Sequence, residues 1–210
     1  MNTNTQNEAA DGASFNYRNA VPVLDYEINN VTEIFKSDPG NRYSPKKAVL
    51  PTGVCTTRIH YVGYVGQKRV SETDEGDTKI HIRCSDANST VNIFSNSRFS
   101  SATEQLEDVD RCAYISVIAK LFLTESKEGD TLVGVTPEVV NEVDQDIRER
   151  FLFTASEATL DRISDFSNGA DTADQELAEE HYDVDDLSHY ANAASVAINS
   201  GIQLRNRRLS

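Results

Sequence analysis

The 210-residue sequence has no tryptophan, only three cysteines and no long apolar run. Cys55, Cys84 and Cys112 show no CxxC or CxxH spacing, so we expect neither a disulfide framework nor a metal site, and each cysteine is predicted to lie in a strand. No stretch approaches the ~18 apolar residues of a membrane helix. The polar residues 1–14 lack the features of a signal peptide. We therefore expect a cytoplasmic protein without a cofactor or a membrane partner.

Basic residues are also scarce, because 20 Lys and Arg face 34 Asp and Glu, which gives a net charge of −14. Such a charge ordinarily counts against nucleic acid as a partner. The acidity is uneven, however: residues 141–190 carry −12, residues 54–140 carry −4 and residues 191–210 carry +3. The nearly neutral middle of the chain can therefore still bind nucleic acid.

The middle of the chain reads as strands rich in Val, Ile and Tyr, separated by clusters of Gly, Asp, Glu and Ser. Between the third and fourth strands, Ser101 and Glu104 have the spacing of a helix capping box. The turns are expected at 71–77, 86–89 and 127–130, and Pro137 is expected to close the last strand. The predicted strands are 56–66, 78–84, 90–95, 113–123 and 131–135, with a helix at 101–109.

Five strands with one helix between the third and the fourth match a small barrel of the OB type. The predicted fold is mainly β plus α: a five-stranded OB-fold barrel followed by an acidic C-terminal helical segment. The predicted division of the chain is a disordered N-terminus (1–20), a lead-in segment (21–53), the OB-fold nucleic-acid-binding domain (54–140), the acidic helical tail (141–200) and a basic end (201–210).

The C-terminal segment shows helical periodicity. Ser167 to Gly169 should stop a first long helix, and Thr172 with Gln175 has the spacing of a second capping box. The acidic surface is either a solvated face, a docking module for a basic surface, or an autoinhibitor that imitates DNA. The buried faces are predicted to be Val143, Ile147, Phe151, Ala155, Ala158, Ile163 and Phe166, and then Leu187, Tyr190, Ala191, Ala194 and Ile198.

One face of the second and third strands carries an unusual set of side chains. Apolar residues alternate with Lys79, His81 and Arg83 in the second strand, and the same alternation turns Phe94 outward in the third. Strands two and three form the ligand-binding face of OB barrels, and single-stranded nucleic acid is bound by cations and by aromatic rings that stack on bases. The candidate nucleic-acid-binding residues are Arg58, His60, Lys68, Arg69, Lys79, His81, Arg83, Phe94, Asn96, Arg98 and Phe99.

Each of these residues also has a simpler interpretation. Exposed Lys and Arg side chains on a strand are most often only solvated. Phe94 can pack under the N-terminal segment instead of binding a base, and His60 and His81 are more typical of surface or half-buried positions than of catalysis. Only the combination of Lys79, Arg83 and Phe94 on one face favours a functional role.

Enzyme motifs are missing or incomplete. Asp183 to Asp186 resembles the start of an EF-hand loop, but Ser188 and Ala194 stand where the loop needs glycine and glutamate. Residues 63–68 lack the P-loop spacing, and neither GxSxG nor HExxH occurs. We therefore expect no catalytic residues.

Several stretches together resemble a known family: Tyr43-Ser-Pro, Val49-Leu-Pro-Thr-Gly53, Thr57-Arg-Ile-His-Tyr-Val-Gly63, Ala113 to Lys120, Pro137-Glu, Glu142-Val-Asp144, Arg150-Phe and Thr154 to Ile163. Through them, residues 42–198 resemble the replication-protein-A-associated proteins of halophilic archaea. This resemblance implies an OB fold that binds single-stranded DNA in replication, repair or recombination, in a hetero-oligomer with a larger replication protein A subunit. Some relatives carry a cysteine-ligated zinc finger that this chain lacks, and residues 95–100 depart from the family pattern, which leaves the stacking residue open between Phe94 and Phe99.

The composition is consistent with a halophilic protein. Acidic surfaces stay hydrated at high salt, and Arg (13) outnumbers Lys (7). High salt weakens phosphate contacts, so binding should depend mainly on base stacking, which contributes ~1–3 kcal/mol per base. The alternative is a non-enzymatic structural adaptor whose OB fold binds only a protein partner.

Overall fold

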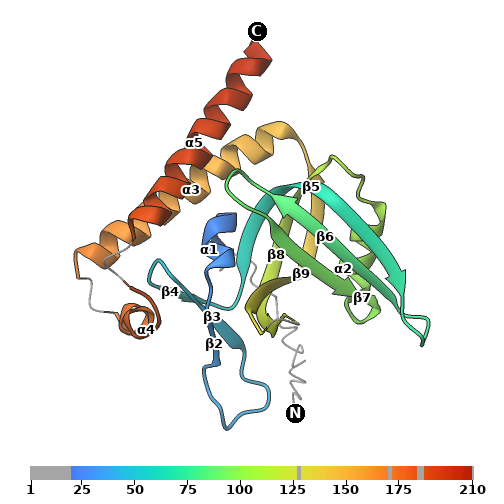
Figure 1. The fold of residues 1–210 in the computed structure, drawn as a ribbon, viewed down its shortest axis with the longest axis horizontal. Coiled ribbons are helices and arrows are strands. Elements are labelled where there is room, and N and C mark those ends of the chain that lie inside the picture. The colour runs from blue at the N-terminus through green and yellow to red at the C-terminus, as the bar shows by residue number, and fades with distance from the viewer. Residues whose placement is uncertain (1–19, 127–128, 170–171, 184–186, 210) are drawn as a thin grey trace, which may run out of the picture.

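The computed structural model describes residues 20–126, 129–169, 172–183 and 187–209. The predicted disorder of the N-terminus and half of the predicted turn at 127–130 lie outside the described residues. The elements form two parts, a curved sheet with one helix and a helical layer that lies along one side of it (Figure 1). No helix within the described ranges is long and apolar enough to cross a membrane.

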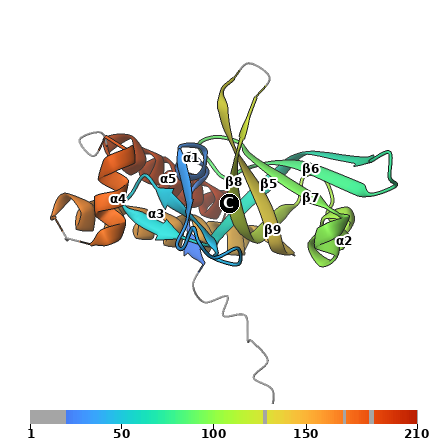
Figure 2. The ribbon, with the colours of Figure 1, turned by 90° about the horizontal axis from the view of Figure 1, so that it is seen from below.

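The larger sheet closes on itself. Its strands are β1 (Val21–Pro22), β5 (Ile59–Glu72), β6 (Thr78–Ser85), β7 (Val91–Asn96), β8 (Tyr114–Glu125) and β9 (Thr131–Val143). The order is β1-β5-β6-β7-β9-β8, and a further pairing of β5 with β8 closes the ring. Helix α2 (Ser100–Asp108) follows the short 3-10 helix η2 (Ser97–Phe99) between β7 and β8 (Figure 2). A closed sheet with a helix between its third and fourth strands is an OB-like fold.

The predicted strands are present, but two of them are longer and one cap is wrong. The first, β5, continues to Glu72, and the last, β9, passes through Pro137 to Val143. A proline fits there because Pro137 lies opposite Ala119, beside a register irregularity where β8 pairs with β9. The predicted cap at Ser101 is not used, since α2 starts one residue earlier, after Phe99, without a side-chain cap. The sheet also has a sixth strand, because the lead-in segment adds β1 beside β5.

The core of the closed sheet is formed by the inward side chains of each strand, such as Ile82, Val91 and Ile115. Cys84 is part of this core, where burial raises the pKa of its thiol to about 12, so it acts as a small apolar residue. Cys55 lies in β4 (Val54–Thr56), as predicted. Cys112 does not lie in a strand: it is exposed and has a φ of 73° in the turn before β8.

The lead-in segment, which gave no clear sequence signal, is folded. It forms β1, helix α1 (Asp25–Asn29) and, with β4, a small antiparallel sheet of β2 (Glu33–Lys36), β3 (Lys46–Leu50) and β4. Asp25 of α1 holds the predicted turn at 86–89, because its Oδ2 accepts hydrogen bonds from the backbone N–H of Ser89 at 2.6 Å and of Asp86 at 3.3 Å. This segment is therefore part of the core structure that fixes the β6–β7 hairpin.

The acidic helices pack on the sheet rather than forming a detached tail. Helix α3 (Gln145–Ser167) runs beside α5 (Ser188–Leu209), and α4 (Ala173–His181) follows the end of α3 (Figure 1). Phe151 and Leu152 of α3 bury Val62 of β5 in one apolar cluster with Leu24. The helices therefore cover the outer face of the first half of β5.

A buried ion pair fixes this cover. Glu27 of α1 is 1% exposed, and its carboxylate accepts hydrogen bonds from Arg162 Nη2 at 2.8 and 3.0 Å. Thr159 and Thr52 donate to the same carboxylate at 2.7 and 2.8 Å. The lead-in segment and α3 are thereby joined through a buried charge pair that two threonine hydroxyls also hold.

The predicted helix faces are correct only in part. Phe151, Ala155 and Phe166 are buried, but Ile147 is 44% exposed and Val143 belongs to β9. The Thr172–Gln175 capping box is confirmed at the start of α4. In α5, Ala194 is buried as expected, together with Leu187 just before it.

Candidate functional site

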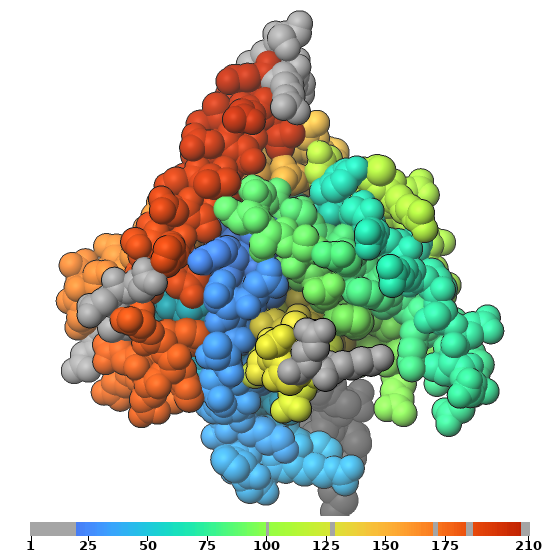
Figure 3. Space-filling view, in the orientation of Figure 1, coloured from blue at the N-terminus to red at the C-terminus, as the bar shows by residue number. Residues whose placement is uncertain are grey.

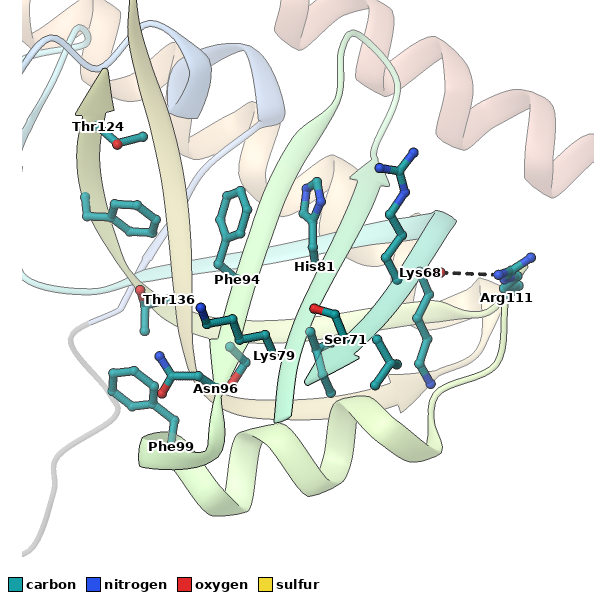
Figure 4. Close-up of a pocket in the computed structure, with 15 residues that line it drawn as sticks. Lys68, Ser71, Lys79, His81, Phe94, Asn96, Phe99, Arg111, Thr124 and Thr136 are labelled. Atoms are coloured by element: carbon teal, nitrogen blue, oxygen red, sulfur yellow. Dashed lines mark hydrogen bonds between the residues drawn. The ribbon is translucent and has the colours of Figure 1, made fainter. Parts of the chain in front are cut away.

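A groove of about 970 Å³ opens on the outer face of β6 and β7 (Figure 4). One side is formed by the end of β5 and by Arg111, and the other by the β8–β9 hairpin. The lining residues are Lys68, Arg69, Val70, Ser71, Lys79, Ile80, His81, Phe94, Ser95, Asn96, Phe99, Arg111, Phe122, Thr124 and Thr136.

Three rings lie in a row on the floor of this groove. The rings of His81 and Phe94 are stacked, with centroids 4.5 Å apart and planes inclined by 7°, and they stand side by side in Figure 4. Phe122 meets Phe94 edge to face, with centroids 5.9 Å apart. Phe94 remains 38% exposed, so one part of its surface is open to a ligand.

The register of the sheet explains this row. His81 pairs with Phe94 across β6 and β7, so the two side chains leave the same face at neighbouring positions. Phe122 pairs with Gly134 across β8 and β9. A Cβ at Gly134 would overlap with the Phe122 ring, so the glycine provides the space in which that ring lies across the neighbouring strand.

Both candidate stacking residues line the groove. Phe94 lies in the middle of the ring row, whereas Phe99 follows Arg98 in η2 at one end of the groove and is 43% exposed. Phe94 could instead have packed under the N-terminal segment. Its ring neighbours are His81 and Phe122, so residues 20–53 do not cover it, and residues 1–19 lie outside the described residues.

The cationic side chains of the groove differ in whether they are exposed or already hydrogen-bonded to the protein. Lys79 is exposed, and Arg69 is exposed opposite His81. The ammonium group of Lys68, by contrast, donates to the carbonyls of Glu107 and Val109 (2.8 Å to the latter) at the end of α2. Arg111 donates to the Lys68 carbonyl at 3.3 Å (Figure 4). Lys79 and Arg69 are thus best placed to meet an anionic ligand, while Lys68 stabilises the helix end.

The structure brings seven of the eleven predicted residues into the groove. Arg83 and Asn96 lie on the same face, but only Asn96 lines the groove, and Arg83 lines a smaller depression next to it. Arg98 is exposed in η2 outside the lining. The lining members are Lys68, Arg69, Lys79, His81, Phe94, Asn96 and Phe99.

Arg58 and His60 lie elsewhere. Arg58 forms an ion pair with Glu138, and Lys120 approaches the same carboxylate at 2.6 Å. Burial alone would raise the pKa of Glu138, but the hydrogen bonds from the two cations lower it below its usual value. His60 is half-buried against Phe151 of α3, with ring centroids 5.0 Å apart, so the helices separate it from the groove.

The sequence analysis did not identify Phe122, Arg111, Thr124 and Thr136, which also line the groove. The signal was present, because Val117, Ala119 and Leu121 of the fourth strand are buried and Phe122 has the opposite parity. Applying the alternation to the fourth strand would have placed Phe122 on the outer face with Phe94.

The chemistry of the groove is that of flat, apolar surfaces with cations at the rim. Across the part of the chain that the structure describes, no group of three or more His, Cys, Asp or Glu could hold a metal ion. Partly exposed rings favour a ligand with a planar π system, and the cations favour one that also carries negative charge.

No family model and no curated protein matches this chain. Among solved structures, it is similar to the wild-type single-stranded DNA binding protein from Thermus aquaticus, with 12% identity and a TM-score of 0.36 over 41% of this chain and 50% of that chain. It is also similar to OBody AM3L09, which was solved bound to hen egg-white lysozyme, with 12% identity and a TM-score of 0.34 over 41% and 81% of the two chains. The match therefore spans half the length of the Thermus protein. Because these similarities are low, we interpret the groove from its own geometry.

Proposed function

We propose that the groove binds single-stranded DNA by stacking bases on its aromatic row. The observation that carries this proposal is the partly exposed Phe94 between His81 and Phe122, with Lys79 and Arg69 at the rim. Bases in a single strand expose their faces, and each base that stacks on an aromatic side chain contributes ~1–3 kcal/mol. Duplex DNA hides those faces, so the groove should favour single strands.

The position of the groove supports the same proposal. We take the closed sheet to be a five-stranded OB barrel, with β6 and β7 as its second and third strands. In such barrels oligonucleotides bind the face of these strands, between the loop after the first strand and the loop before the fifth. Here those loops are the turn at 73–77 and the β8–β9 hairpin, and the groove lies between them.

For the biological role, our proposal rests on the family resemblance of residues 42–198. We assign the chain as an accessory subunit of a replication protein A complex in archaeal replication, repair or recombination, acting in the cytoplasm of a halophile and without catalysis. At molar salt the phosphate contacts weaken, so an acidic protein can bind DNA mainly through stacking.

The second candidate is a structural adaptor that binds only protein. Two exposed apolar side chains favour it: Val70, which lines the groove, is 55% exposed, and Leu132 in the β8–β9 hairpin is 48% exposed. Exposed apolar side chains that gather on one surface are also typical of protein-binding sites.

The two candidate functions are distinguished by measuring the binding of labelled oligo-dT to the purified protein in molar KCl. Fluorescence polarisation reports this binding. Phe94→Ala should weaken binding by roughly 5- to 100-fold, the loss of one stacked base. Arg83→Ala should weaken it less, because salt already screens its phosphate contact. If neither substitution changes DNA binding while assembly with the partner is intact, the groove is a protein interface.

The acidic surface is proposed to dock the larger subunit. Glu176, Glu179 and Glu180 are exposed on α4, far along the chain from the groove. Replacing the three with Gln should abolish co-purification with the partner and leave oligo-dT binding of the isolated chain unchanged. Co-purification that survives the triple substitution would remove the docking role from α4.

A further inference from the structure

The outer face of the β5–β6 pair does not stop at the groove. In the register of these antiparallel strands Arg69 lies opposite His81, Gln67 opposite Arg83 and Tyr64 opposite Ser85. Opposed residues point to the same side of a sheet, and the register irregularity at Gly66 lets both Gln67 and Tyr64 face outward. The same face therefore leads from the groove past Arg83 to Tyr64.

Two more depressions follow this face. The first, of about 290 Å³, is lined by Gly66, Gln67, Arg83 and their neighbours. The second, of about 430 Å³, is lined by Tyr64 and Tyr114, and the C-terminal part of α5 closes it with Ser200 and Gln203. Figure 3 shows the surface of the β6–β7 region next to that of α5. The two depressions share Ser85, so they are neighbours on this face.

The far depression contains a second aromatic pair. The rings of Tyr64 and Tyr114 have centroids 5.6 Å apart and planes inclined by 60°, and both side chains are partly exposed. Arg148 of α3 places its guanidinium carbon 5.2 Å from the centroid of the Tyr114 ring. Arg148 is itself buried and donates a hydrogen bond to the Asp86 carbonyl. Tyr114 is thus held in place by the helical layer.

Tyr64 is held from the other side. Its pKa is raised first by a hydrogen bond between its side chain and that of Cys112. Cys112 has the φ of 73° noted above, and its backbone N–H donates to the Val65 carbonyl at 3.0 Å. A left-handed backbone in a residue other than glycine is rare and marks a position that its surroundings hold firmly.

We propose that the tyrosine pair is a second base-binding subsite, which takes the continuation of the same DNA strand after it leaves the groove past Arg83. This inference rests on the proposed function. Lys79 and Ser85 are six residues apart on β6, so the two subsites are separated by roughly 20 Å. Binding sites of about 4–16 nucleotides are typical of one OB fold, and one strand can therefore reach both.

A length series tests the second subsite. Oligo-dT of about 4 nucleotides should fill only the groove, whereas oligo-dT of about 16 nucleotides should fill both subsites. Tyr64→Leu should weaken binding of the long probe by roughly fivefold or more and leave the short probe unchanged. Tyr64→Phe keeps the ring and loses only the hydroxyl that contacts Cys112, so it should bind the long probe much more tightly than Tyr64→Leu does. Equal affinity of Tyr64→Leu and native protein for the long probe would overturn the subsite.

Alkylation of Cys112 gives a readout without any substitution. Cys112 is the exposed cysteine of the three and touches Tyr64, while Cys84 is buried. Long oligo-dT should slow the reaction of Cys112 with iodoacetamide, whereas saturating short oligo-dT should not. Mass spectrometry measures the extent of alkylation. If both probes bind but neither protects Cys112, the second subsite is wrong and the groove remains. If neither probe binds, the proposed function itself fails and the subsite with it.

Discussion

Two ends of one outer sheet face end up in opposite environments. His60 on β5 and His81 on β6 both occupy outward positions, and both are flanked by apolar core residues. His60 lies under α3, next to Phe151 and 3.0 Å from Ser116 Oγ. His81 lies in the groove, stacked on Phe94. Strand alternation therefore determines which side chains leave the core, but the packing of other elements determines which of them meet a ligand.

The covered end depends on contacts between distant parts of the chain. The Glu27–Arg162 pair joins α1 to α3, and the apolar cluster of Leu24, Val62 and Leu152 fills the space between them. The open end has no such layer among the described residues, and its aromatic row remains partly exposed. The acidic helices thus shape the site by leaving one end of the sheet uncovered.

The largest effect on stability is expected at the covered end. Glu27→Ala leaves Arg162 buried without its partner, which should lower the free energy of unfolding by about 3–5 kcal/mol. Urea unfolding in molar KCl measures this loss. The control is Arg150→Ala, which changes an exposed residue on α3, the helix that carries Arg162. Its free energy of unfolding should stay within about 0.5 kcal/mol of that of the native protein. A loss for Glu27→Ala no larger than that of the control would show that the pair does not hold the cover.

Much of the sheet could be predicted from sequence, and the reason is local. Turn clusters and alternation suffice to place five strands and to turn Phe94 outward. The lead-in strands β2 and β3 were not predicted, although Pro39-Gly40 between them is a turn signal. Strands of four and five residues show too little alternation to identify a hairpin. His60 was assigned to the binding face because alternation carries no information about Phe151, which follows 91 positions later in the chain.

The same limit explains the residues that were missed. The Phe122 ring lies over the neighbouring strand because Gly134, which pairs with Phe122, leaves room for it. Arg111 comes from the turn after α2 and reaches the rim through its contact with Lys68. Alternation along the fourth strand suffices to turn Phe122 outward, but its position beside Phe94 and the position of Arg111 at the rim depend on the closure of the sheet, which no single strand encodes.

A smaller effect, on DNA binding, is expected at Phe122 in the open end. Phe122→Leu removes the edge-to-face partner of Phe94, which should weaken oligo-dT binding by about 1 kcal/mol, less than Phe94→Ala. Gly134→Ala should weaken binding in the same direction without removing the ring, because the added Cβ displaces it. Fluorescence polarisation measures both, with Leu132→Ala in the same hairpin as the control. Native affinity in Gly134→Ala would mean that the position of the Phe122 ring does not matter for binding.

The smallest expected effect tests the covered histidine itself. Burial lowers the pKa of His60 below its usual 6.5, so the unfolded chain takes up a proton at a higher pH than the folded protein does. The stability that the neutral His60 ring contributes is therefore fully present above pH 6.5 and is lost as the pH falls through the lowered pKa. In His60→Gln this loss should vanish, so the native protein should lose more stability than the variant between about pH 7 and pH 5. Taking the difference between the two urea titrations cancels the other ionisable groups. Parallel pH profiles for the two proteins would show that His60 titrates freely and that α3 does not cover it in solution.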